Sequence, residues 1–255
     1  MQLNFKSYGT GEPLIILHGL FGSLDNWHSV GQNLADRFHV LAVDQRNHGN
    51  SPHSDEMTYT AMAKDLAELL EREGSRSAHL LGHSMGGKTA MQFALLFPSV
   101  VRSLIVADIS PRADSPRHAT IFSALLALDL SAFKTRTEVL QALAPPIPDL
   151  ALRQFLVKNL SLDHGGGLRW KIGLKEIFHN YDRLREAVDG AGTFKGSTLF
   201  VRGEYSDYLL ESDLPAIKQL FPGARLETLP HAGHLMHVEN REAFIKLIRD
   251  FLLTS

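Results

Sequence analysis

A serine flanked by glycines stands where a short apolar run gives way to a helical pattern. The segment reads AHLLGHSMGGKTAMQFALLF, with Ser84 at the centre of Gly82-His83-Ser84-Met85-Gly86. A turn this tight strains the backbone of its central residue, and larger flanking side chains would collide with strand and helix. The hydroxyl is thereby pushed outward in front of a helix N-terminus, where a developing negative charge is favoured. The pattern predicts that Ser84 is a nucleophile.

Short apolar strands alternate with amphipathic helices along most of the chain, which is typical of a mostly parallel sheet with helices on both faces. The predicted strands are 13–17, 39–43, 78–81, 103–107, 198–201 and 225–229. The predicted helices are 25–36, 58–73, 84–97, 211–221 and 240–253. An edge strand near residues 3–8 is expected to form a hairpin with 13–17 through Gly9–Gly11.

The alternation stops between residues 109 and 195, where helical stretches at 121–130 and 150–159 are predicted but no parallel strand. Three consecutive glycines, Gly165–Gly167, predict the turn of a small hairpin there. An interruption of this length is more often a functional insertion than a loop. We therefore predict a core of residues 1–108 and 196–255, with residues 109–195 as a mainly helical cap before the penultimate strand.

Four short motifs resemble those of the α/β-hydrolase superfamily. They are HGLFGS at His18–Ser23, DQRNHGNS at Asp44–Ser51, GHSMGG at Gly82–Gly87 and AGHLMH at Ala232–His237. Together with ADISP at Ala107–Pro111, they are most similar to the small bacterial esterases of the YbfF type and their mammalian abhydrolase-domain relatives. The likeness extends along essentially the whole chain, and it implies the α/β-hydrolase fold and hydrolysis of esters by a serine.

The base and the oxyanion donors are predicted from their places along the chain. His234 follows the last predicted strand, as the order serine, acid, histidine of this fold requires, and its imidazole can accept the Ser84 proton. The backbone amides of Leu20 and Met85 are the expected donors to the oxyanion. In the alternative interpretation, His18-Gly19 before Leu20 only makes a tight turn.

Two aspartates are candidates for the carboxylate that orients His234. Asp108 ends the strand 103–107, and Asp207 follows the strand 198–201, although Ser206 occupies the commoner position. A carboxylate buried at a strand end needs a partner. The resemblance favours Asp108, with Ser206 hydrogen-bonding near the histidine, and Asp207 stays open as the alternative. His83 is a further candidate for a supporting role.

Two histidines flank His234 at spacings of three, which raises the question of a metal site. Pro230 and Gly233 disfavour a regular helix there, and no Asp or Glu pattern accompanies the histidines. We therefore expect no metal, and we expect His231 and His237 to be loop or surface residues.

Other residues are assigned mainly structural roles. The loop with Arg46, Asn47 and His48 is expected to brace the floor of the site, and Lys88 is expected to be at the surface or ion-paired. Phe21 and Trp170 are candidates to line the substrate cavity, and an anchoring role in the hairpin is equally open for Trp170.

Composition excludes several classes of function. The 255 residues contain no cysteine, which excludes disulfides, thiolate zinc sites and a cysteine nucleophile. The net charge of −2 gives no reason to expect nucleic acid or an anionic membrane surface as a partner. The first residues show no signal peptide, and no apolar run approaches the ~20 residues that cross a bilayer. We expect a cytoplasmic protein without a cofactor, and its oligomeric state is not predicted.

The predicted function is hydrolysis of small or medium acyl esters through an acyl-serine intermediate. Three alternatives share the fold: an acyl-CoA thioesterase, a cofactor-free haloperoxidase and a non-catalytic ligand-binding protein. A haloalkane dehalogenase would carry aspartate in place of Ser84.

Overall fold

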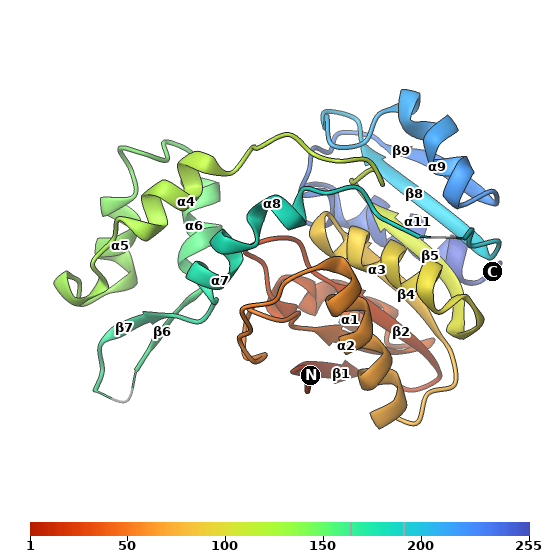
Figure 1. The fold of residues 1–255 in the computed structure, drawn as a ribbon, viewed down its shortest axis with the longest axis horizontal. Helices are drawn as coiled ribbons and strands as arrows, with labels where there is room; N and C mark the ends of the chain where they lie inside the picture. The colour runs from red at the N-terminus through yellow and green to blue at the C-terminus, as the bar shows by residue number, and fades with distance from the viewer. Residues whose placement is uncertain (164, 191) are drawn as a thin grey trace.

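A seven-stranded sheet forms the centre of the protein, and a separate two-stranded hairpin lies outside it (Figure 1). The computed structural model describes residues 1–163, 165–190 and 192–255. The central strands lie in the order β1-β3-β2-β4-β5-β8-β9, and all neighbours are parallel except β1 and β3. They are β1 (Phe5–Tyr8), β2 (Glu12–Leu17), β3 (Phe38–Val43), β4 (Ala78–His83), β5 (Val101–Ala107), β8 (Ser197–Gly203) and β9 (Ala224–Leu229). The predicted mostly parallel sheet is confirmed.

The parallel strands end in register at one edge of the sheet. Their apolar runs are buried because helices cover both faces, as expected for parallel strands. Leu17 of β2 lies opposite Gly82 of β4, and Ala107 of β5 lies opposite both His83 and Val201. The loops that follow these strands therefore begin side by side at the carboxyl edge.

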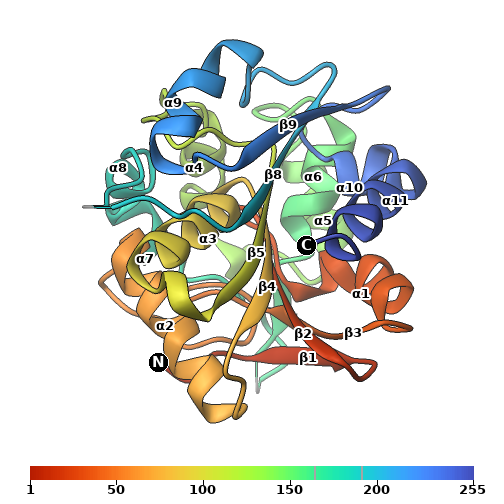
Figure 2. The same cartoon turned by 90° about the vertical axis from the view of Figure 1, so that its right-hand side faces the viewer.

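Helices α2, α3 and α9 pack against one face of the sheet, and α1 and α11 pack against the other (Figure 2). α2 begins after Thr58, whose hydroxyl accepts the Ala61 amide, and Leu66 and Leu70 lie on its buried side. The core helices are η1 (Leu24–Trp27), α1 (His28–Leu34), α2 (Tyr59–Arg72), α3 (Met85–Leu96), η2 (Pro98–Val100), η4 (Glu211–Asp213), α9 (Leu214–Leu220), α10 (Met236–Glu239) and α11 (Arg241–Leu252). Among the described residues, no helix is long and apolar enough to cross a bilayer.

The first strand does not form the predicted hairpin with β2. β1 pairs antiparallel with β3, with Tyr8 opposite Val40. Both edges of β2 are taken by its parallel neighbours β3 and β4, so β2 offers no edge to β1. Gly9 and Gly11, at φ 66° and 121°, carry the chain across the start of β3, where a Cβ atom on Gly9 would lie 2.7 Å from the Phe38 carbonyl oxygen. The hairpin prediction was wrong because neighbours in sequence are separated here by an intervening strand.

The elements between β5 and β8, which we call the cap elements, form a group of their own (Figure 1). They are α4 (Ala119–Leu126), η3 (Leu130–Ala132), α5 (Arg136–Ala142), α6 (Leu150–Val157), β6 (Leu160–Leu162), β7 (Leu168–Trp170), α7 (Leu174–His179) and α8 (Tyr181–Leu184). The antiparallel pair β6 and β7 is the hairpin predicted around Gly165–Gly167. The cap elements share a third apolar cluster with Phe21 and Met85, which places them over the carboxyl edge of the sheet.

Candidate active site

Ser84 occupies the turn between β4 and α3. Its φ of 52° and ψ of −120° lie in a region that residues with a side chain rarely adopt. Sterics require the flanking glycines: a Cβ atom on Gly82 would lie 2.1 Å from the Gly86 carbonyl oxygen, and one on Gly86 would lie 2.5 Å from that of Leu17. Because α3 begins at Met85, its N-terminus lies directly behind the serine. The structure thus has the strand-turn-helix geometry predicted for Ser84.

Asp108 and His234 form a hydrogen-bonded pair, with Nδ1 of the imidazole 2.7 Å from Oδ2 of the carboxylate. Asp108 is fully buried immediately after β5, and its φ is 53°. Its carboxylate also accepts hydrogen bonds from the Gly203 amide, at 3.0 Å, and from the Ser206 hydroxyl. These donors offset the cost of burying the carboxylate. An imidazole that donates from Nδ1 keeps Nε2 free to accept a proton.

Asp207 lies in a different environment. Its side chain is 72% exposed, and Oδ1 forms an ion pair with Arg117. That pair lowers the pKa of the Asp207 carboxyl group. The carboxylate that contacts His234 is therefore Asp108, and Ser206 contacts the same carboxylate.

The loop that carries His234 is held on two sides. The His83 Nε2–H donates to the backbone carbonyl of His234 at 2.7 Å, and burial keeps the pKa of His83 well below its usual value. The Tyr208 ring stacks on the His234 ring with centroids 3.8 Å apart. His83 thus supports the position of the imidazole through the backbone, and Tyr208 supports it by stacking.

Two backbone amides next to Ser84 are available to a ligand. The loop after β2 packs directly on the serine, since a Cβ atom on Gly19 would lie 3.3 Å from the Ser84 Cβ. The amides of Leu20 and Met85 donate no hydrogen bond to any residue that the structure describes. Free amides beside a nucleophile can stabilise the oxyanion of a tetrahedral intermediate.

Two buried histidines hold this loop in place. His18 Nε2 accepts the Gln45 amide at 3.1 Å, and His48 Nε2 accepts the Phe21 amide at 3.2 Å. Burial lowers the pKa of His18 to about 4 and that of His48 to about 3. Both rings are therefore neutral near pH 7, and each keeps one nitrogen as an acceptor.

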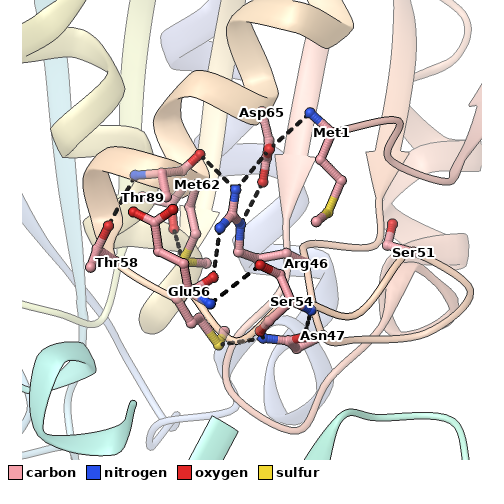
Figure 3. A network of polar contacts seen from close by, with 12 residues as sticks. Met1, Arg46, Asn47, Ser51, Ser54, Glu56, Thr58, Met62, Asp65 and Thr89 are labelled. Atoms are coloured by element: carbon pink, nitrogen blue, oxygen red, sulfur yellow. Dashed lines mark hydrogen bonds and ion pairs between the residues drawn. The ribbon is translucent and has the colours of Figure 1, made fainter. Parts of the chain in front are cut away.

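Arg46 and Asn47 hold the loop after β3 by hydrogen bonds to α2 and to the loop itself. Figure 3 shows the Arg46 guanidinium between Asp65 and Glu56. Its Nε and Nη2 donate to the two Asp65 oxygens at 2.7 and 2.9 Å, and Nη1 donates to the Glu56 carbonyl at 2.6 Å. Asn47 exchanges two hydrogen bonds with the Ser54 backbone at 2.7 and 3.0 Å. These bonds fix a loop in which Asn47 itself has a φ of 64°.

A cavity of about 300 Å³ opens in front of the serine. Ser84, His234, Leu20 and Phe21 all line it, so the structure brings the predicted nucleophile, base and Phe21 to one space. No hydrogen bond joins the Ser84 and His234 side chains in this structure. Such contacts often tighten only when substrate binds.

Trp170 does not line this cavity, so that prediction was wrong. It borders a separate hollow of about 260 Å³ on the cap elements, together with Leu126 and Leu128. The short strand β7 directs Trp170 to this hollow, which the turn position alone could not indicate.

His237 is also misassigned by the sequence. It is buried and stacks on Trp27 with centroids 4.3 Å apart, and burial lowers its pKa to about 3. The side chain of His231 is 81% exposed. Among the described residues, no three His, Asp or Glu side chains are arranged to hold a metal.

Lys88 is ion-paired, but it is not a surface residue. Its side chain is completely buried, and Nζ lies 2.6 Å from Asp114 Oδ2 and 2.8 Å from the carbonyls of Arg112 and Glu186. Burial lowers the pKa of Lys88, and the Asp114 carboxylate opposes that change. Two segments join the cap elements to β5 and β8. Lys88, on α3, therefore holds both of these segments against that helix.

Sequence reasoning missed most of the cavity wall, including three polar residues close to His234: Arg117, His118 and Tyr208. The Arg117 guanidinium lies over the Tyr208 ring at 4.4 Å, and burial lowers the pKa of His118 to about 4. No local motif marks them. Their only signal is position, since Arg117 and His118 lie in the segment after β5 and Tyr208 lies in the loop after β8.

Comparisons with known proteins identify relatives along nearly the whole chain. The model of the family described as alpha/beta hydrolase fold matches residues 12–241. The chain is 32% identical to the esterase YbfF of Escherichia coli over 99% of both chains. It is 37% identical to the mouse sn-1-specific diacylglycerol lipase ABHD11, over 94% of this chain and 80% of the relative. The solved structure of a marine microorganism esterase superposes with a TM-score of 0.96 at 43% identity, covering 98% of this chain and 99% of that one.

Proposed function

The chain belongs to the α/β-hydrolase fold family, and from this membership and the geometry of the site we propose that it is a serine carboxylic-ester hydrolase acting through an acyl-Ser84 intermediate. Small or medium acyl esters are the proposed substrates. Residues 1–108 and 196–255 act as the catalytic core, and residues 109–195 act as the cap that limits the size of the substrate. The cytoplasmic location remains a prediction from the sequence.

Each residue of the site has one task in this mechanism. Ser84 Oγ attacks the ester carbonyl while His234 Nε2 accepts the hydroxyl proton, and the imidazolium then returns that proton to the leaving alcohol. Asp108 orients the imidazole and stabilises its charged form. The Leu20 and Met85 amides hold the oxyanion, which typically contributes ~10²–10³ in rate for each donor. Water then releases the acyl group from Ser84 by the same steps.

The observation that carries the proposal is the buried Asp108–His234 pair at the wall of the cavity that Ser84 also lines. A thioester is cleaved by the same tetrahedral chemistry, so acyl-CoA substrates lie within the proposed activity. Ester and thioester panels of matched acyl length would rank the two.

Labelling of the intact protein by a fluorophosphonate tests the mechanism. We expect Ser84→Ala to abolish labelling and to lower hydrolysis of p-nitrophenyl acetate by at least about 10⁴-fold, as for other serine nucleophiles. Ser123→Ala, at an exposed position on α4, is the matched control and should label normally. A folded wild-type protein that neither labels nor cleaves esters would contradict the proposal and favour a ligand-binding role.

A further inference from the structure

Two cavities have Ser84 in their walls. The larger, of about 300 Å³, contains His234 in its wall, and the smaller, of about 40 Å³, contains Met85 and Leu184 instead. Ser84, Leu20, Arg117, His118 and Tyr208 line both. An ester carbonyl bound at Ser84 can therefore place its acyl group in one cavity and its alcohol group in the other.

The position of His234 decides which group enters which cavity. The imidazole returns its proton to the leaving oxygen, so the alcohol must lie within reach of that ring. His234 borders only the larger cavity. The acyl group is then left to the smaller cavity, next to Met85, whose amide is one of the proposed oxyanion donors.

We propose that the small cavity is the acyl subsite and the large cavity is the alcohol subsite, so that the preferred substrates are short-chain acyl esters of bulky, apolar alcohols. This assignment rests on the proposed function. A volume of about 40 Å³ admits about three groups the size of a water molecule or methyl, which corresponds to acetyl through butyryl. The large cavity is walled by Phe155, Leu152 and Trp27, side chains that suit an apolar ring or chain.

The wall of the small cavity is tied by hydrogen bonds and cannot expand without breaking them. The Tyr59 hydroxyl donates to the Leu184 carbonyl at 2.7 Å. The Tyr181 hydroxyl accepts the Arg117 and His118 amides at 3.1 and 3.2 Å. A longer acyl chain would have to break these hydrogen bonds to enter, so it gains little by doing so.

A pair of cavity-enlarging variants tests the assignment. Leu184→Ala widens the small cavity, and Leu152→Ala, on the large cavity alone, is its matched counterpart. The acyl series is p-nitrophenyl acetate to decanoate, and the alcohol series is the acetates of methanol, benzyl alcohol and 2-naphthol, each measured as kcat/KM. Thermal melts check folding, and Leu184→Val replaces Leu184→Ala if the larger truncation unfolds the protein.

For the wild-type protein we expect kcat/KM to fall at least about tenfold between the butyrate and the octanoate, since one misfit methylene is worth about tenfold or more. Leu184→Ala should move the acyl optimum to longer chains and keep the order of the alcohols. Leu152→Ala should change the order of the alcohols and keep the acyl optimum. A wild-type optimum at octanoate or longer, or a shift of the acyl optimum by Leu152→Ala alone, overturns the assignment. Either outcome would leave the serine mechanism standing, whereas a protein without fluorophosphonate labelling would contradict the mechanism itself.

Discussion

The carboxyl edge of the sheet and the cap elements both border the site, but they differ in backbone strain and in side-chain burial. At the edge, the loops after five parallel strands each contain a residue other than glycine at positive φ: Phe21, Asn47, Ser84, Asp108 and His231. Each such conformation costs about 1–3 kcal/mol and persists only where surrounding contacts hold it. The cap elements are short helices and one two-stranded hairpin. Large apolar side chains stay exposed on them, among them Leu126, Leu150, Leu162 and Phe178.

The difference shows where geometry is strict and where it is adjustable. The proposed reacting groups lie on the strained edge, where many hydrogen bonds hold the loops and fix distances for proton transfer. The cap elements supply cavity walls, and they reach the edge through a limited set of polar contacts, such as Asn180 with Asp55 and Gly173 with Asn47. Changes at the edge should therefore act on the rate of reaction, and changes in the cap elements on which substrates fit.

The largest effect is expected on kcat when Asp108 and Asp207 are replaced separately by asparagine. Asp108→Asn should lower kcat by about 10²–10⁴-fold with a small change in KM, because an amide cannot hold the imidazole in its reactive tautomer. Asp207→Asn should stay within about threefold of wild type, because it removes only an exposed ion pair with Arg117. The measurement is steady-state hydrolysis of p-nitrophenyl acetate. Equal losses in the two variants would show that the edge does not depend on one carboxylate.

Removing the charge of Lys88 tests how the two regions are joined. Lys88→Met leaves the Asp114 carboxylate and two carbonyls without their donor, so we expect the free energy of unfolding to fall by about 3 kcal/mol in urea titrations. Lys64→Met, at an exposed position on α2, is the matched control and should have little effect. Hydrolysis per folded molecule should change less than tenfold, since Lys88 contacts no reacting atom. A stable variant would mean that the connecting segments are held elsewhere.

The edge was more predictable from sequence than the cap elements, for physical reasons. The turn at Ser84 is specified locally, because only glycine fits at Gly82 and Gly86. The choice between Asp108 and Asp207 stayed open because both follow strands that end at the same edge, and only side-chain direction separates them. The wall residues Arg117 and Tyr208 meet across 91 positions of sequence, and no local pattern encodes such a contact.

Acid should weaken the edge through its buried histidines. In the unfolded chain, His18 and His48 bind protons near pH 6.5, whereas in the folded protein their pKa values are about 4 and 3. From about pH 6.5 down to pH 4 the unfolded state therefore binds more protons, and the free energy of unfolding falls as pH is lowered. Each histidine contributes up to about 1.4 kcal/mol per pH unit.

Urea titrations at about pH 7.5, 6 and 5 would measure this slope. His48→Gln should make the slope shallower, because glutamine can still accept the Phe21 amide but does not titrate. His179→Gln, at an exposed position on α7, is the matched control. If the two variants have identical slopes, burial of His48 does not make the edge sensitive to acid.

The smallest effect is expected for a variant of Asn159, which tests whether the cap elements also influence kcat. Buried Asn159, between α6 and β6, donates from Nδ2 to the Phe21 carbonyl at 2.7 Å, in the loop that carries the Leu20 amide. Asn159→Ala should cost about 1 kcal/mol of stability and lower kcat by a few-fold, because the loop loses one of its anchors. Asn33→Ala, exposed at the surface of α1, is the matched control. A change in KM without any change in kcat would show that the cap elements affect only how the substrate fits. A loss of kcat would show that this one hydrogen bond from the cap elements also helps to position the loop of the Leu20 amide.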